Sequence, residues 1–138
     1  MLFDAGATSG ISGWNSIWSK LPDDTTAIRY SRRGEGGSSA CHGDLSAKDY
    51  VDDVEKLFKT LKISTPIIYV SHSYGSKVAR EYAKRNPSKI TAMLFLDPIN
   101  PRDVEIIESL DPINGAQANE GLKQSDLAKG AKTNWCLI

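Results

Sequence analysis

The feature that most constrains this chain is a buried-strand pattern that passes directly into a helix pattern, with a serine at the junction. Residues 66–70 (PIIYV) form a continuous apolar run of strand length, which is typical of a parallel strand covered on both faces. Apolar side chains then recur at helical spacing at Val78, Ala79, Tyr82 and Ala83. Between the two patterns lies SHSYG (residues 71–75), so we expect a strand, a tight turn carrying Ser73, and a helix.

Strand and helix patterns alternate along the rest of the chain. Strands are expected at residues 2–5, 26–30, 66–70 and 90–96, and helices at 14–21, 46–61, 78–85 and 102–110. Ser46 is a good N-cap, and Asp49 three residues later completes a near-capping box. The alternation predicts an α/β fold with a mostly parallel sheet and helices on both faces.

A serine on a strand-to-helix turn with small neighbours resembles the nucleophile elbow of α/β-hydrolases. Here the residues two before and two after Ser73 are Ser71 and Gly75. Ser73 should therefore have a positive φ, and the backbone N–H of Tyr74 should face a substrate oxyanion. An ordinary β–α turn that binds nothing is the plainer interpretation of the same five residues.

Further segments resemble the α/β-hydrolase superfamily in the correct order. Residues 4–7 (DAGA) look like the family's oxyanion loop after its third strand. Residues 30–38 (YSRRGEGGS) are similar to its Tyr-Asp-Arg-x-Gly-x-Gly-x-Ser loop, with Ser31 in place of Asp. Residues 94–98 (LFLDP) resemble the strand after the elbow. The resemblance covers residues 2–101.

The resemblance implies a strand order. The four strands would correspond to the family's third to sixth and lie in space as fourth, third, fifth, sixth. Right-handed crossovers then place the helix near Trp14 on one face and the next two helices on the other. Ligands of open α/β sheets bind where the strand order reverses, and Ala7 and Ser73 lie there. Backbone N–H groups of Ala7 and Tyr74 would form the oxyanion hole.

Ser73 as nucleophile implies acyl transfer on an ester or amide, with no cofactor and no metal. A serine hydroxyl needs a general base, commonly histidine oriented by a carboxylate. The sequence holds only His42 and His72, and neither stands where the family places its catalytic histidine. Asp97 is a candidate for the acid, because a minority of the family place the acid after the sixth strand.

Two functions remain open from the sequence. The chain is either the core of a serine hydrolase that is incomplete as it stands, or a non-catalytic module that keeps the pocket for a small molecule or protein. A nucleotide-binding domain is disfavoured, because Gly34 to Gly37 do not open a helix in a phosphate-loop pattern. We divide the chain into a partial hydrolase core (1–101) and the weakly ordered start of a cap (102–138), which would set the substrate.

Composition narrows the partners. The chain has 17 basic and 17 acidic residues, so nothing recruits nucleic acid, and no apolar run approaches the ~20 residues that span a bilayer. No signal-peptide pattern follows Met1, so a cytoplasmic location is expected. The expected partner is a small acyl substrate. Strands 26–30 and 90–96 would be sheet edges without neighbours, so self-association is also expected.

Overall fold

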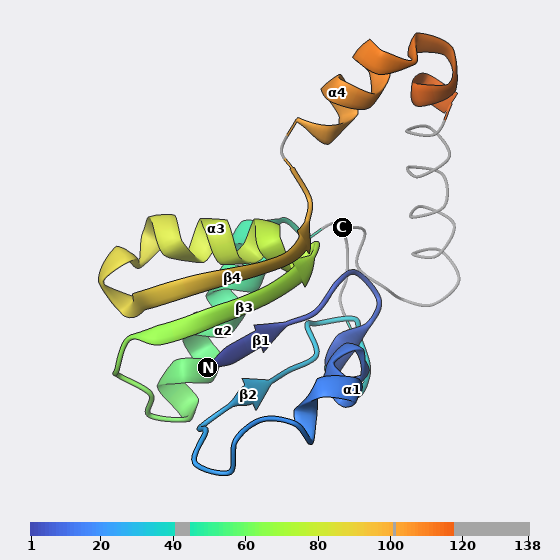
Figure 1. Cartoon of the computed structure of the whole chain (residues 1–138). Coiled ribbons are helices and arrows are strands. Elements are labelled where there is room, and N and C mark those ends of the chain that lie inside the picture. The colour runs from blue at the N-terminus through green and yellow to red at the C-terminus, as the bar shows by residue number, and fades with distance from the viewer. Residues whose placement is uncertain (41–44, 101, 118–138) are drawn as a thin grey trace.

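A four-stranded parallel sheet forms the centre of the protein in the computed structural model, which describes residues 1–40, 45–100 and 102–117 (Figure 1). Its strands are β1 (Leu2–Asp4), β2 (Ile28–Arg29), β3 (Ile67–Ser73) and β4 (Ile90–Pro98). They lie in the order β2-β1-β3-β4, and every pair is parallel. The predicted fold class and strand order are both confirmed.

β3 is a central strand, as its continuous apolar run predicts. Val70 lies opposite Phe3 of β1 and Leu94 of β4 in the registers of the two pairs. Side chains of β3 alternate between two cores, with Tyr69 fully buried on one face and Val70 on the other. A strand covered on both faces needs apolar residues at every position, which explains the run.

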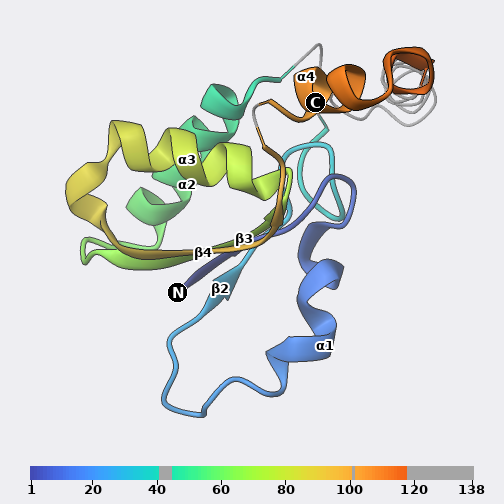
Figure 2. The same ribbon diagram turned by 45° about the horizontal axis from the view of Figure 1, so that its top comes forward.

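Helices cover both faces of the sheet (Figure 2). α2 (Ala47–Thr60) and α3 (Gly75–Arg85) pack on one face, and the short helices η1 (Gly10–Trp14) and α1 (Asn15–Trp18) pack on the other. At the start of α2, the Ser46 backbone N–H and hydroxyl both donate to the Asp49 carboxylate, at 2.8 and 2.6 Å. The capping box read from the sequence is therefore present.

Element boundaries differ from the sequence expectations at several points. The helix expected over 14–21 begins as the 3-10 helix η1 and ends at Trp18, while Leu21 packs on the core from a loop. β2 keeps only two of the five expected residues. β4 runs two residues further, to Pro98, because its pairing with β3 continues to Ser73.

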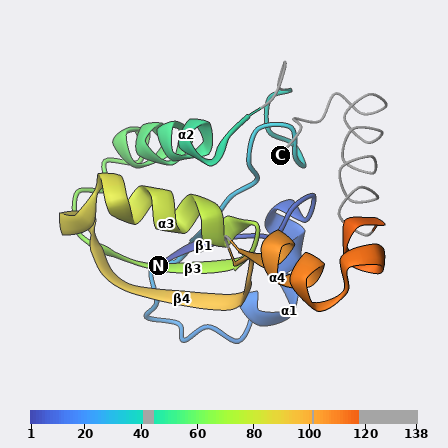
Figure 3. The same cartoon turned by 90° about the horizontal axis from the view of Figure 1, so that it is seen from above.

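Beyond β4 the chain leaves the sheet. α4 (Asp103–Leu110) projects beyond the carboxyl ends of the strands (Figures 1 and 3). Its apolar side chains Ile106, Ile107 and Leu110 are exposed, so no second core forms among the residues described here. The division at residue 101 and the order of 118–138 stay predictions, since 118–138 lie outside the described residues. No helix in the described ranges is long and apolar enough to cross a membrane.

Candidate active site

Ser73 lies where the sequence pattern placed it, at the junction of β3 and α3. It is the last residue of β3, Tyr74 is the N-cap of α3, and Gly75 is the first helical residue. Its φ is +48°, which is unfavourable for a residue with a Cβ and is typical of functional sites. The predicted elbow conformation is confirmed, while a catalytic role for Ser73 stays a prediction.

The two small neighbours of Ser73 have different surroundings. A Cβ on Gly75 would lie 2.6 Å from the carbonyl oxygen of Asp4 and 2.9 Å from that of Ala5, so no side chain fits there. Ser71 is fully buried, and its hydroxyl has no hydrogen-bond partner among the described residues. The departure from glycine at position 71 therefore buries an unpartnered polar atom, which is costly.

The loop after β1, residues 5–9, lies against the elbow. A Cβ on Gly6 would stand 3.4 Å from the Cβ of Ser73 and 2.9 Å from Nδ1 of His72. The next residue, Ala7, is exposed. Within the described part of the chain, no acceptor is recorded for the N–H of Ala7 or of Tyr74. Two unpaired donors thus occupy segments on either side of Ser73, and their convergence on its Oγ stays a prediction.

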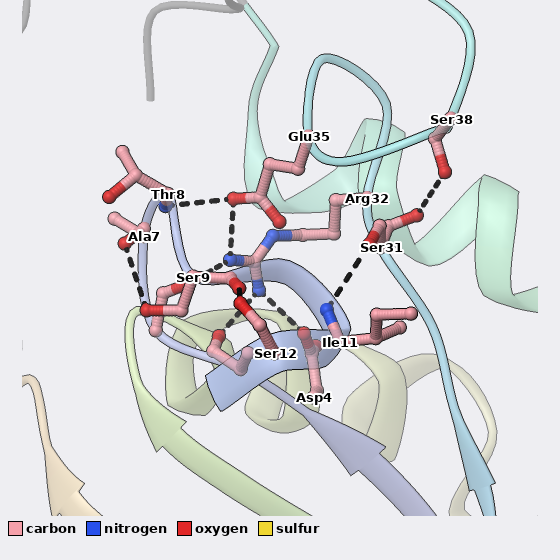
Figure 4. A network of polar contacts seen from close by, with 12 residues as sticks. Asp4, Ala7, Thr8, Ser9, Ile11, Ser12, Ser31, Arg32, Glu35 and Ser38 are labelled. Atoms are coloured by element: carbon pink, nitrogen blue, oxygen red, sulfur yellow. Dashed lines mark hydrogen bonds and ion pairs between the residues drawn. The ribbon is translucent and has the colours of Figure 1, made fainter. Parts of the chain in front are cut away.

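A buried ionic cluster of Asp4, Arg32 and Glu35 lies behind the loop after β1 (Figure 4). Arg32 Nη1 is 2.5 Å from Asp4 Oδ1, and Nη2 is 3.0 Å from Glu35 Oε1. The side chains of Arg32 and Asp4 are each 1% exposed. Arg32 also donates to the carbonyl oxygens of Ala5 and Gly6, both at 2.7 Å. The cluster is therefore bonded directly to the loop.

Burial and charge act in opposite directions on the pKa values of this cluster, and burial prevails at Asp4. It raises the pKa of Asp4, against the opposing effects of the Arg32 charge and of the Tyr69 hydroxyl, which donates to Asp4 Oδ2 at 2.9 Å. Burial alone would lower the pKa of Arg32, but the charges of Asp4 and Glu35 outweigh it and the net shift is upward. Arg32 therefore stays charged in the interior.

The remaining candidates are not assembled around Ser73. His72 is half-buried and lies against Gly6, and no hydrogen bond joins it to Ser73 in the part of the chain described. Asp97 is exposed near the end of β4 with a φ of +43°, one residue before the Pro98 that pairs with Ser73. His42 lies outside the described residues. The structure brings the post-β1 loop to Ser73, and among the residues it describes no base is bonded to Ser73.

The buried cluster of Asp4, Arg32 and Glu35 is not evident from the sequence pattern. Arg32 and Glu35 stand among glycines and serines, in a segment whose polarity reads as a solvated loop. The available signal was Asp4, a carboxylate at the end of a buried strand, because a charge at such a position needs a partner. Ser31 has a role of its own, since its Oγ accepts the Ile11 N–H at 3.1 Å.

Comparison with known proteins agrees with this geometry. The family model described as alpha/beta hydrolase fold matches residues 5–134, nearly the whole chain. This chain belongs to the α/β-hydrolase family.

Two curated relatives of this α/β-hydrolase chain show how much of a family member it spans. It is 30% identical over 125 residues to 2-(acetamidomethylene)succinate hydrolase of Mesorhizobium japonicum, covering 89% of this chain and 45% of that protein. It is 30% identical over 98 residues to the uncharacterized protein YqjL of Bacillus subtilis, covering 71% of this chain and 39% of that protein. The chain thus spans less than half the length of these relatives.

Solved structures share the same fold. The crystal structure of E-2-(acetamidomethylene)succinate hydrolase superposes with a TM-score of 0.66 at 28% identity, covering 79% of this α/β-hydrolase chain and 41% of that one. Hydrolase activity is therefore the property of a named relative in this family.

Proposed function

We propose that this chain forms the nucleophile-bearing core of a serine hydrolase that acts on an ester or amide. The observation that carries the proposal is Ser73 at the β3–α3 junction with a φ of +48°, against a loop whose Gly6 approaches its Cβ. Strain of this kind on a non-glycine residue persists only where the surrounding structure enforces the conformation, and such residues cluster at functional sites. The named hydrolase relative supports the same class of reaction on a small molecule.

The reaction follows from these positions. Ser73 Oγ attacks the carbonyl carbon of the substrate, forming an O–C bond while the carbonyl π electrons move onto oxygen. The backbone N–H groups of Ala7 and Tyr74 donate to that oxyanion, and the start of α3 adds its dipole. The oxyanion then collapses, the alcohol or amine leaves, and water later releases the acyl group from Ser73.

The first step also needs a base for the Ser73 proton. His72 is the one histidine among the described residues and has no recorded bond to Ser73. The family resemblance implies that the histidine follows the last strand, after residue 138 in this numbering. We propose Asp97 as the carboxylate that orients this histidine, because its φ of +43° makes it a second strained position beside the elbow.

A non-catalytic binding module is the second candidate function. It is favoured by one observation, that no base is bonded to Ser73 in the ranges that the structure describes. In this alternative, the unpaired N–H groups of Ala7 and Tyr74 would bind a carbonyl or carboxylate oxygen without any covalent step. The two functions differ in whether Ser73 becomes acylated.

Acylation is therefore the test. The chain is incubated with p-nitrophenyl acetate, and the acetylated residues are located by mass spectrometry over time. Acetyl transfer to Ser73 releases p-nitrophenolate and passes the hydroxyl proton to water. We expect slow acetylation of Ser73 that is still much faster than that of Ser88, an exposed serine outside the site. Equal rates at Ser73 and Ser88 would refute the hydrolase proposal and favour the binding module.

Turnover separates the base candidates. We expect little steady release of p-nitrophenolate, because no base is bonded to Ser73 in the part of the chain that the structure describes. Robust turnover that is lost in Ser73→Ala but kept in His42→Ala and His72→Ala would show that another base acts on Ser73.

A cytoplasmic location is part of the proposal as well, and fractionation of cells expressing the full gene would test it.

Self-association through the edges of the sheet is our proposal for the isolated chain. β4 has nine residues, and within the described sheet it pairs on one side only, with β3. Its side chains Leu94 and Leu96 are 51% and 39% exposed. A long apolar edge strand is a template for another strand. A second copy of this chain carries the same edge, so the two β4 strands can pair with each other.

A further inference from the structure

We propose that Arg32 and Glu35 are positioning residues that aim the Ala7 N–H at the oxyanion formed on Ser73. The proposal rests on the proposed hydrolase function and deepens it. Arg32 and Glu35 do not touch the substrate in this assignment. They act through the loop after β1, to which they are bonded (Figure 4).

Arg32 fixes the peptide plane between Gly6 and Ala7. Its Nη2 donates to the carbonyl oxygen of Gly6 at 2.7 Å, so that carbonyl points into the buried cluster. In a planar trans peptide, the carbonyl of one residue and the N–H of the next point in opposite directions. The N–H of Ala7 therefore points away from Arg32, out of the cluster.

Glu35 fixes the next peptide plane, between Ala7 and Thr8, with its N–H and not its carbonyl facing the cluster. Its Oε1 accepts the backbone N–H of Thr8 at 2.9 Å, so this N–H points into the cluster. By the same planarity, the carbonyl of Ala7 points outward. The N–H and the carbonyl of Ala7 therefore both point away from the buried cluster. Since Gly6 lies against Ser73, an outward Ala7 N–H is placed to serve an oxygen bound there.

The backbone of the loop shows why such fixing is needed. Thr8 has a φ of +65°, a genuine outlier for a β-branched residue. A conformation of this kind persists only when surrounding contacts over-determine it. The bond from Thr8 N–H to Glu35 is the contact at that residue, and Glu35 is in turn held by Arg32 at 3.0 Å. Without the carboxylate, the loop is free to relax and turn the Ala7 N–H away.

The distribution of bonds distinguishes this role from simple neutralisation of Asp4. Arg32 donates four hydrogen bonds within the described residues: one to Asp4, two to loop carbonyls, and one to the Glu35 that holds Thr8. Asp4 has a second partner in Tyr69. An arginine placed only to pair with Asp4 would not need to direct its guanidinium N–H groups at the carbonyl oxygens of Ala5 and Gly6.

The experiment compares three variants of Glu35 with a matched control in the same cluster. Glu35→Leu removes the acceptor of Thr8 N–H, Glu35→Gln keeps an oxygen acceptor of the same reach, and Glu35→Asp keeps the charge but withdraws it by one methylene. Tyr69→Phe is the control, because it deletes a buried hydrogen bond to Asp4 without touching the loop. Circular dichroism establishes that each variant is folded.

Two quantities are measured on the folded variants: the rate of Ser73 acetylation by p-nitrophenyl acetate, and amide hydrogen exchange of Thr8 relative to Val70. We expect Glu35→Leu to slow acetylation about tenfold or more, since loss of one oxyanion donor costs about 10² to 10³ in complete enzymes. Its Thr8 exchange should accelerate while Val70 exchange does not. Glu35→Gln should stay near the wild-type rates, and Glu35→Asp should lie between them.

The outcomes separate the two proposals. If Glu35→Leu changes acetylation and Thr8 exchange no more than Tyr69→Phe does, the positioning role is wrong. Should Glu35→Leu not fold, the same comparison is decided by Glu35→Asp. If wild-type Ser73 is acetylated no faster than Ser88, the proposed function fails, and the catalytic positioning role fails with it. Thr8 exchange would then report only whether Glu35 fixes the loop.

Discussion

The first residue of α3, Gly75, touches the end of β1: a Cβ on it would lie 2.6 Å from the carbonyl oxygen of Asp4. This contact joins the helix that begins beside Ser73 to the strand that leads into the loop after β1. Direct backbone contact therefore sets the distance between the two halves of the candidate site, the start of α3 and the loop after β1. No side chain fits at this contact. Any group larger than hydrogen must separate them.

Gly75→Ala tests this contact. The obstacle is backbone rather than a flexible side chain, so we expect a loss of about 1 to 3 kcal/mol in the free energy of unfolding. Ser73 acetylation should fall as well, because Gly6 is moved from Ser73. Gly37→Ala is the matched control, since its Cβ would meet nothing within 4 Å. Equal stabilities of the two variants, measured by urea unfolding, would contradict the close approach.

The strain at Ser73 predicts a variant that is more stable and inactive. Glycine adopts a positive φ without the cost of roughly 1 to 2 kcal/mol borne by residues with a Cβ. Ser73→Gly should therefore unfold at higher urea concentration than Ser73→Ala while both lose acetylation at residue 73. Superposed unfolding curves for the two variants would show that the φ of +48° is not maintained in solution.

Lys62→Gly provides the control for that comparison. Lys62 has a φ of +55° just after α2, where the Ile63 N–H bonds the Phe58 carbonyl and the Lys62 N–H bonds that of Lys59. This is a Schellman ending, in which glycine is the usual residue. We expect Lys62→Gly to stabilise the protein by up to about 1 kcal/mol and to leave Ser73 acetylation unchanged.

Tyr69→Phe should destabilise the protein in a pH-dependent way. Because burial raises the pKa of Asp4 above its ordinary 3.8, the stability linked to its proton is full below that pH and is lost as pH rises through the raised value. Tyr69 opposes this loss by donating to the carboxylate. The variant should therefore lose about 1 to 3 kcal/mol at neutral pH and less in acid.

Thermal unfolding over a pH series measures this effect. Tyr82→Phe is the matched control, because Tyr82 is buried but no hydrogen bond is recorded for its hydroxyl in the described ranges. We expect the Tm difference between Tyr69→Phe and wild type to grow as pH rises, and that for Tyr82→Phe to stay small throughout. A pH-independent difference for Tyr69→Phe would mean that its hydroxyl does not favour the charged form of Asp4.

The sequence predicted the elements whose information is local. The apolar run of β3, the SHSYG turn and the Ser46–Asp49 capping box each lie within a few residues, and each is present in the structure. The strand order came from the family resemblance rather than from periodicity. β2 and α1 were predicted too long, because their patterns do not reveal how few residues find a partner.

The buried cluster was out of reach for a different reason. Asp4 and Arg32 are 28 residues apart, and their pairing depends on β1 lying beside β2 in the folded sheet. Asp4 in a buried strand indicates that a partner is needed, but nothing local identifies Arg32, which stands among loop residues, as that partner. Only the three-dimensional arrangement shows that Arg32 donates to the carbonyl oxygens of Ala5 and Gly6 in the loop beside Ser73.

The isolated chain should self-associate through β4. Leu94 and Leu96 lie on the face of β4 opposite Met93 and Phe95, which pack against the core beneath α3. Both leucines are well exposed, and the outer edge of β4 has no partner in the described sheet. We expect size-exclusion chromatography to show concentration-dependent oligomers, and Leu94→Lys/Leu96→Lys to shift them to monomer, since charges on an edge strand oppose pairing.

Leu61→Lys is the control for this prediction, because Leu61 is 49% exposed at the end of α2 and belongs to no strand. It removes about as much exposed apolar surface as one of the two β4 substitutions and should leave the oligomers unchanged. If Leu61→Lys disperses them as well as the β4 variant does, association is non-specific and the edge is not its cause. A wild-type monomer at all concentrations with a cooperative transition above about 60 °C, the upper mesophile range, would show that the exposed edge is tolerated by a self-sufficient domain.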